Sequence, residues 1–124
     1  MAVPRITKEE LKRRLDEPSV APPVLIDVRL KYPYEHSTIR LPGALRMAPG
    51  TLDRSLLPRD RDIVLYDSDP EELVAERAAA DLITDGYRAF ALQGGVSGWI
   101  AAKLPAERKS APQLAVPVGG ATKG

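Results

Sequence analysis

A short apolar run that leads directly into an acidic turn places the tightest constraint on how this chain folds. The run is Ile63-Val64-Leu65-Tyr66, and its β-branched and aromatic residues are typical of a buried strand. The turn that follows, residues 67–72, reads Asp-Ser-Asp-Pro-Glu-Glu. Asp69 is placed to cap a helix, with Pro70 at the first helical position and Glu72 three residues after the cap. The sequence therefore predicts a strand that ends at the N-terminus of a helix.

Such a junction points backbone N–H groups into the turn, an arrangement that ordinarily attracts an anion. Here the turn supplies its own negative charges, on Asp67, Asp69, Glu71 and Glu72. An external anion is opposed, because two unit charges about 4 Å apart repel by roughly 1 to 4 kcal/mol at effective dielectric constants of about 80 to 20. We expect Asp67 to fold into the turn and accept hydrogen bonds from its N–H groups, in place of a bound anion.

The composition excludes several classes of function. The chain has 124 residues, enough for one compact domain, and no cysteine, which rules out disulfides, thiolate metal sites and thiol nucleophiles. Its formal net charge is +1, with 18 Lys and Arg against 17 Asp and Glu, so nothing favours nucleic acid or a membrane surface as a partner. No segment resembles a signal peptide or a membrane span. We expect a soluble cytoplasmic protein without a cofactor or a resident metal.

Capping signals and periodicity predict four helices. Thr7 and Glu10 form a capping box before a short amphipathic helix that Pro18 ends. A short helix is expected over residues 51–57. The helix over 71–85 is expected to end at Gly86. Five of its apolar residues are expected to face the sheet: Leu73, Val74, Ala78, Leu82 and Ile83. A last helix over 96–102 is expected to pack Trp99 into the core.

Two further segments, residues 24–29 and 88–92, predict strands. The first is apolar except for Asp27 and Arg29 near its C-terminal end, the end that carries the functional loops in a parallel α/β sheet. We expect these two side chains to form an ion pair or hydrogen-bonded pair that orders those loops. The alternation of helices and strands predicts one α/β domain over residues 1–106 with a parallel sheet. The aperiodic composition of residues 107–124 predicts a flexible C-terminal tail.

Four short motifs follow one another along residues 5 to 106. They are Ile26-Asp27-Val28-Arg29; Glu35 followed by Arg40-Leu41-Pro42-Gly43-Ala44; Ile63-Val64-Leu65-Tyr66; and Gly94-Gly95-Val96-Ser97-Gly98-Trp99 with Leu104-Pro105. In this order and at this spacing they resemble the rhodanese-like (sulfurtransferase-like) domain family. The resemblance implies a mainly parallel sheet of about five strands with helices on both faces, in agreement with the α/β prediction.

The resemblance also implies a chemistry whose nucleophile is absent here. Family members carry a cysteine directly after the central strand, where loop N–H groups and a helix N-terminus stabilise its thiolate and persulfide. That position corresponds to Asp67, and Tyr66-Asp67-Ser68-Asp69-Pro70 stands where one branch of the family reads Tyr-Cys-Ser-Cys-Pro. A carboxylate cannot carry a sulfane sulfur, so the persulfide route is closed.

The resemblance assigns the remaining site residues by position. The active loop comprises Ser68, Asp69, Pro70, Glu71 and Glu72, and the supporting loop ends are Asp27, Arg29 and Arg40. Glu71 and Glu72 stand where many members have a basic residue. Ile39 and Arg40 replace a frequent Gly-His pair, and His36 does not match that histidine; we expect His36 to be a surface residue.

Three functional hypotheses follow. The first is a catalytically inactive rhodanese-like domain that acts as a binding or regulatory module for an unidentified protein partner. The second is an enzyme that uses Asp67 for phosphoryl transfer or metal-assisted hydrolysis, with Asp69 or Glu71 as further oxygen ligands. The third is a thiosulfate sulfurtransferase whose cysteines were replaced by engineering. Tyr32 and Tyr34 are expected either to anchor their loop or to contribute to a partner surface.

Overall fold

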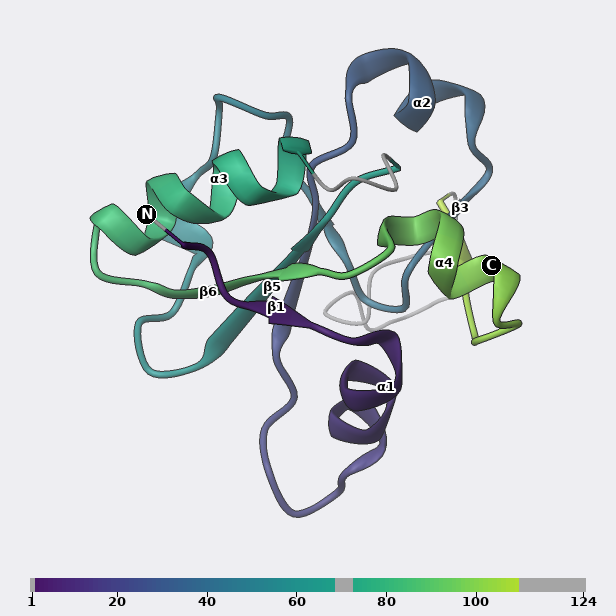
Figure 1. The fold of residues 1–124 in the computed structure, drawn as a ribbon, viewed down its shortest axis with the longest axis horizontal. Coiled ribbons are helices and arrows are strands. Elements are labelled where there is room, and N and C mark those ends of the chain that lie inside the picture. The colour runs from purple at the N-terminus through teal and green to yellow at the C-terminus, as the bar shows by residue number, and fades with distance from the viewer. Residues whose placement is uncertain (1, 69–72, 110–124) are drawn as a thin grey trace, which may run out of the picture.

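The centre of the molecule is a parallel five-stranded sheet with the strand order β1-β6-β5-β2-β4. The structure is a computed structural model that describes residues 2–68 and 73–109 (Figure 1). The strands of this sheet are β1 (Arg5–Ile6), β2 (Val24–Asp27), β4 (Leu45–Arg46), β5 (Asp62–Tyr66) and β6 (Arg88–Leu92). This confirms the predicted α/β class and the parallel sheet.

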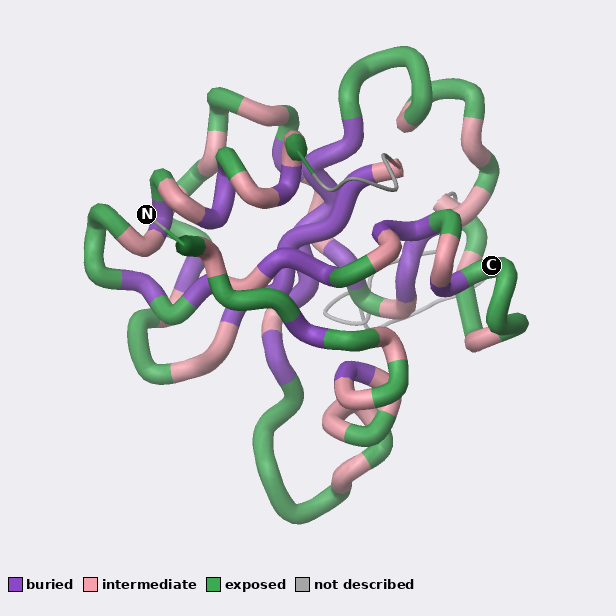
Figure 2. Tube along the Cα trace, viewed as in Figure 1, coloured by how far each residue is buried: buried purple, intermediate pink, exposed green. Residues whose placement is uncertain are grey.

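Helices cover both faces of the sheet, and β5 explains how two cores arise. Side chains alternate along a strand, so Ile63 and Leu65 pack on one face and Val64 and Tyr66 on the other. The first face is covered by α3 (Leu73–Thr84), and the second by α1 (Lys8–Asp16) and α4 (Gly95–Ala101). Figure 2 shows the buried residues running along the central strands, which are covered from both sides.

The helix ends follow the predicted local chemistry. The Thr7 side chain caps α1 by accepting a hydrogen bond from the Glu10 backbone N–H at 3.1 Å, as the capping box predicts. Gly86 follows α3 with a φ of +92°, and its N–H donates to the Ile83 carbonyl at 3.0 Å. A left-handed residue directly after a helix favours glycine, so Gly86 ends α3 as predicted.

One prediction for α3 is wrong. Leu73 was expected to face the sheet, yet it is 55% exposed. It precedes the buried Leu82 by nine residues, which is about two and a half turns of helix, so the two side chains point in opposite directions. The sheet-facing residues of α3 are Ala75, Ala78, Ala79 and Leu82. Residues 71 and 72 of the predicted helix lie outside the described residues.

The passage between β2 and β5 holds short elements that the sequence pattern did not predict. They are α2 (Lys31–His36), β3 (Ile39–Arg40) and β4, followed by a 3₁₀ turn η1 (Arg54–Leu56) in place of the helix expected over 51–57. The turn stays short because Asp53 caps it through the Ser55 N–H at 3.0 Å, and Pro58 follows closely.

A final strand, β7 (Glu107–Arg108), pairs antiparallel with β3 and forms a separate two-stranded sheet. Residues 107 and 108 therefore lie in a strand, where the sequence analysis expected the tail to begin. Residues 110–124 lie outside the described part of the chain. Among the described helices, none is long and apolar enough to span a membrane.

Candidate functional site

A buried ion pair occupies the carboxyl end of β2, as the sequence predicts. The Arg29 guanidinium donates to Asp27, with its Nη2 at 2.6 Å from Oδ2 and its Nε at 3.0 Å from Oδ1. The Tyr66 hydroxyl, at the end of the neighbouring β5, donates to Asp27 Oδ2 at 3.0 Å. All three side chains are almost completely buried. A buried carboxylate needs such partners, because an unpaired charge in the interior costs several kcal/mol.

Arg29 and Tyr66 keep fixed protonation states at neutral pH. Burial on its own lowers the pKa of Arg29, but the hydrogen bond and negative charge of Asp27 outweigh it, so that the pKa lies above its ordinary value. Burial, together with the nearby charge of Asp27, raises the pKa of the Tyr66 hydroxyl well above 10.0. Arg29 therefore stays charged and Tyr66 stays protonated, which keeps both as donors to Asp27.

The same network holds the segment that follows α2. Arg29 Nη2 donates to the Ile39 carbonyl at 2.9 Å, and the Leu41 N–H donates to the Tyr66 hydroxyl at 3.1 Å. Arg40 lies between these two residues, but its side chain points toward β7 instead of this network. Its side chain pairs with Glu107 at 2.5 Å and donates to the Lys109 carbonyl at 3.0 Å. Arg40 thus fastens β7 to β3, whereas Asp27 and Arg29 form the pair beneath the site.

Asp67 directly follows β5 and is 1% exposed. Its Oδ2 accepts a hydrogen bond from the Ala75 backbone N–H of α3 at 2.7 Å, and its own carbonyl accepts one from the Val96 N–H of α4 at 2.8 Å. The expected contact between this carboxylate and a backbone N–H group is present. Ser68 comes next, and its carbonyl accepts a hydrogen bond from the Ser97 hydroxyl at 3.3 Å. The loop residues Asp69, Pro70, Glu71 and Glu72 lie outside the described residues.

Gly95 allows this close approach between α4 and the end of β5. It has a φ of +59°, and a Cβ atom at this position would lie 2.5 Å from the Asp67 carbonyl oxygen. Sequence reasoning predicted a turn at Gly94-Gly95 but did not connect it with Asp67. The glycine pair after a strand was the available signal, since such residues often mark a backbone approach that excludes a side chain.

A pocket of about 470 Å³ opens beside these residues. Its lining includes Arg29, Pro33, Ile39, Ser68, Ser97 and Ile100. The structure therefore brings Arg29 and Ser68 to one pocket, between the α2 region and α4. Its mixture of hydroxyl and apolar groups is typical of a binding pocket with few polar contacts.

Tyr34 anchors α2 through its aromatic ring. Three cations lie over its ring: the guanidinium carbons of Arg46 and Arg29 are 4.1 and 5.4 Å, and the Lys109 Nζ 3.9 Å, from the ring centroid. Tyr34 is therefore a loop anchor, one of its two predicted roles, whereas Tyr32 on the same helix is 65% exposed. Trp99 is fully buried, as predicted, and donates to the Pro105 carbonyl at 2.7 Å. His36 is exposed at the end of α2, as expected.

A metal centre would need several converging ligands. Within residues 2–68 and 73–109, no three His, Cys, Asp or Glu side chains gather in a way that could hold a metal ion. Asp69 and Glu71, the other ligands considered, are not among the described residues.

Comparison with known proteins decides the family. Residues 7–102 match the model of the rhodanese-like domain. This chain belongs to the rhodanese-like domain family. A search of curated proteins found no match.

Solved structures share the fold of this rhodanese-like domain. The BH2092 protein from Bacillus halodurans is 18% identical with a TM-score of 0.72, and 88% of this chain aligns with 82% of that one. A full-length protein from Lactobacillus plantarum is 24% identical with a TM-score of 0.68, covering 84% of this chain and 87% of that one. A thiosulfate sulfurtransferase from Pseudomonas aeruginosa is 26% identical with a TM-score of 0.67, covering 86% of this chain but 19% of that one.

The close approach at Gly95 leads to a first prediction. Gly95→Ala is expected to lower the free energy of unfolding by roughly 1–3 kcal/mol more than Gly50→Ala, because overlap with the Asp67 carbonyl adds to the cost of a positive φ. Gly50 is the matched control, since its φ is +81° and a Cβ there has open space around it. Urea unfolding measures both variants, and equal losses would contradict the proposed packing constraint.

The buried hydroxyl of Tyr66 leads to a second prediction. Its raised pKa means that the unfolded chain loses this proton more easily than the folded one. The contribution of this hydroxyl to the free energy of unfolding is therefore complete below about pH 10. Above that pH it decreases by about 1.4 kcal/mol per pH unit, until the pKa of Tyr66 in the folded protein is reached. Tyr66→Phe is expected to be less stable at about pH 8, yet to lose less stability between about pH 10 and 11. Urea unfolding at each pH gives the two slopes, and parallel slopes would disprove this assignment.

Proposed function

We propose that this rhodanese-like domain does not catalyse sulfur transfer and acts as a binding or regulatory module for a protein partner. One observation carries the proposal: the position of the family's nucleophilic cysteine holds Asp67, whose carboxylate accepts the Ala75 N–H. The carboxylate therefore uses a backbone donor of the kind that stabilises the thiolate in active members.

The chemistry of sulfur transfer explains why this exchange closes the reaction. A thiolate attacks the outer sulfur of thiosulfate, forms a sulfur–sulfur bond and releases sulfite; cyanide then takes that sulfur as thiocyanate and frees the thiolate. The chain has no cysteine to form the persulfide. The Asp67 carboxylate is also buried and already accepts the Ala75 N–H, so this donor is not open to a dianion.

The binding role is supported by what surrounds the turn. Ile100 lines the pocket beside Ser68 and is 40% exposed, and the exposed Tyr32 lies on α2 next to the pocket residue Pro33. Figure 2 shows α2 as an exposed to partly exposed segment. Exposed aromatic and aliphatic side chains at the edge of a pocket are the usual anchors of protein interfaces.

Replacing the aspartate by the family's nucleophile tests the catalytic half of the proposal. The wild-type protein is expected to form no thiocyanate from thiosulfate and cyanide above background. Asp67→Cys is expected to exceed that level by about tenfold or more, because its thiolate would face the Ala75 N–H. Mass spectrometry would show one added sulfur atom on the variant after treatment with thiosulfate.

Ser68→Cys is the matched control, since it adds one thiol a single residue away from the position that contacts Ala75. Equal activity in the two variants would show that the position is not special. Thiocyanate formation by the wild type would overturn the proposal. So would hydrolysis of a phosphoester that disappears in Asp67→Asn, because it would favour an enzyme that uses this carboxylate.

A photo-crosslinking amino acid tests the binding half. Placed at Tyr32 in the cells that produce the protein, it is expected to yield a covalent adduct of defined mass. The same amino acid at Val20, which is 62% exposed in the loop after α1, is the control for non-specific capture. Ile100→Asp should reduce the Tyr32 adduct by roughly tenfold, the effect of about 1.4 kcal/mol of lost binding. Adducts of equal yield at both positions would contradict a partner surface at α2.

A further inference from the structure

Positive charge is concentrated in two segments of the chain, residues 27–46 and 107–109. Their six cationic side chains are Arg29, Lys31, Arg40, Arg46, Arg108 and Lys109, and their three carboxylates are Asp27, Glu35 and Glu107. The two segments therefore carry a net charge of +3, whereas the whole chain carries +1. The remainder of the chain is net negative, so these segments differ from it in the sign of their charge.

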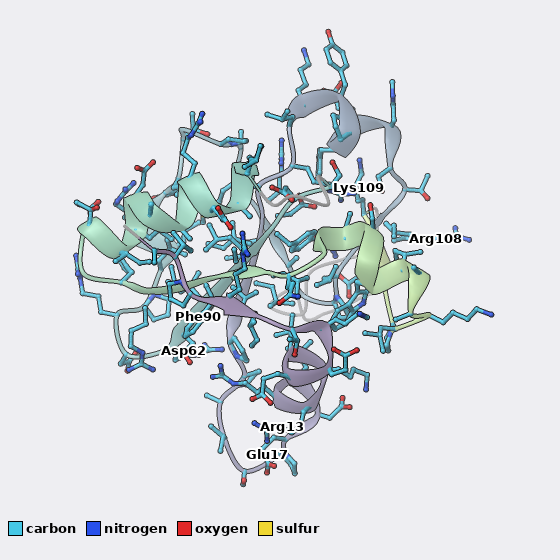
Figure 3. The ribbon with its side chains drawn as sticks, in the orientation of Figure 1. Arg13, Glu17, Asp62, Phe90, Arg108 and Lys109 are labelled. Carbon is cyan, nitrogen blue, oxygen red and sulfur yellow. The ribbon has the colours of Figure 1, made fainter. Side chains whose placement is uncertain are left out.

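The structure packs the two segments against each other. β7 pairs with β3, and the Lys109 N–H donates to the Thr38 carbonyl at 2.9 Å. Lys109 Nζ also donates to the Tyr34 carbonyl in α2. Figure 3 labels Arg108 and Lys109 on the side of the molecule that carries α2 and α4. The two segments thus form one surface, which we call the basic face.

Ion pairs neutralise only part of the charge on the basic face. Asp27 is shared by Arg29 and Arg46, which have guanidinium nitrogens 2.6 and 3.7 Å from its oxygens. Lys31 and Arg108 are exposed, and neither forms an ion pair with a carboxylate within residues 2–68 and 73–109. Exposed positive charge of this kind favours a partner surface of opposite charge.

Arg29 adds a buried donor to the pocket beside Ser68. It lines this pocket although it is only 2% exposed. Its Nε and Nη2 donate to Asp27, and Nη2 also donates to the Ile39 carbonyl. In the part of the chain that the structure describes, Nη1 has no hydrogen-bond acceptor. A buried donor without an acceptor is costly, so an acceptor that enters the pocket would be stabilised there.

The rest of the pocket lining favours a polypeptide as the source of this acceptor. Pro33, Ile39 and Ile100 lie beside Arg29 in the lining, and an apolar side chain can fill the space between them. An inorganic anion has no apolar group to place there. Among the described residues no aromatic side chain lines the pocket, so it lacks the stacking surface that single-stranded nucleic acids use.

We infer that the protein partner presents an acidic segment to the basic face, and that one carboxylate of this segment accepts a hydrogen bond from Arg29 Nη1. The inference rests on the proposed binding role and gives the chemistry of its partner. Arg29 then has two functions, because Nε and Nη2 hold Asp27 while Nη1 binds the partner.

Octaglutamate is the probe for the basic face. Its affinity for the full-length protein is measured from the fluorescence polarisation of an attached fluorescein, with octaglutamine as the uncharged control. Octaglutamate is expected to bind at least about tenfold more tightly. Its affinity should fall between roughly 0.1 M and about 1 M salt, because salt shortens the range over which exposed charges attract. Equal affinities for the two peptides would overturn the inference.

Charge reversal shows where the peptide binds. Lys31→Glu/Arg108→Glu is expected to weaken octaglutamate binding by about tenfold or more, because both side chains are exposed on the basic face. Arg13→Glu/Arg77→Glu makes the same change of charge on α1 and α3, and should change the affinity by less than about twofold. Equal losses in the two variants would overturn the inference. So would tighter binding of an oligothymidine of the same length, which would assign the basic face to nucleic acid.

Arg29→Lys tests the buried donor, because it keeps a positive charge beside Asp27 but removes Nη1. It is expected to weaken octaglutamate binding by about tenfold without changing the salt dependence. Arg46→Lys, the same replacement at a partly exposed neighbour, should leave the affinity unchanged. In the wild-type protein, octaglutamate should shift the NMR signals of the Arg29 guanidinium protons, a measurement that needs no folded variant. Unchanged guanidinium signals would overturn the role of Nη1.

The photo-crosslink at Tyr32 separates failure of this inference from failure of the proposed function. Lys31→Glu/Arg108→Glu should reduce the yield of the Tyr32 adduct by about tenfold, whereas Arg13→Glu/Arg77→Glu should not. An undiminished adduct in the first variant would overturn the acidic segment and leave the proposed binding role standing. The absence of any adduct in the wild type would overturn both.

Discussion

The buried pair of Asp27 and Arg29 is the interaction on which the functional end of the sheet depends. Its carboxylate joins two neighbouring strands, because Asp27 ends β2 and accepts the hydroxyl of Tyr66 at the end of β5. Its guanidinium reaches the Ile39 carbonyl and so positions the segment that returns toward β4. Removing the Asp27 carboxylate would leave the Arg29 guanidinium buried without its ion-pair partner, a change that ordinarily costs about 3–5 kcal/mol. The place where the next turn leaves β5 is therefore set by this pair.

Asp67 stands one residue beyond that network, and its carboxylate is held in a different way. Asp27 pairs with a guanidinium, whereas the Asp67 carboxylate accepts a hydrogen bond from the peptide N–H of Ala75 in α3. The backbone of the same residue is held by the Val96 N–H of α4. Two helices from opposite faces of the sheet thus meet at one residue, and Gly95 keeps the approach free of a side chain. An aspartate can occupy this position because its carboxylate accepts a hydrogen bond from an N–H group that would otherwise attract an anion.

Much of this arrangement could be predicted from local sequence, and the rest could not. The Thr7 cap, the Gly86 stop and the apolar β5 are encoded within a few residues, as is the pairing of Asp27 with Arg29. The two-residue strands β1, β3, β4 and β7 are too short to show a period, so only tertiary pairing reveals them. The close packing of Gly95 against Asp67 joins residues 28 positions apart, and no local pattern specifies it. A Cβ atom added at Gly95 would lie 2.5 Å from the Asp67 carbonyl oxygen. Leu73 was misplaced because an apolar residue at the start of a helix is not necessarily on its buried face.

The contacts at the carboxyl ends of β2 and β5 explain how a rhodanese-like domain keeps its structure without the nucleophilic cysteine. Asp27, Arg29, Tyr66 and Gly95 act through charges, hydroxyls and backbone contacts, and none of them requires a sulfur atom at position 67. The carboxylate of Asp67 supplies an acceptor for the Ala75 N–H, so this contact is made without a ligand. On the surface around the turn, α2 and α4 present Tyr32 and Ile100 to solvent.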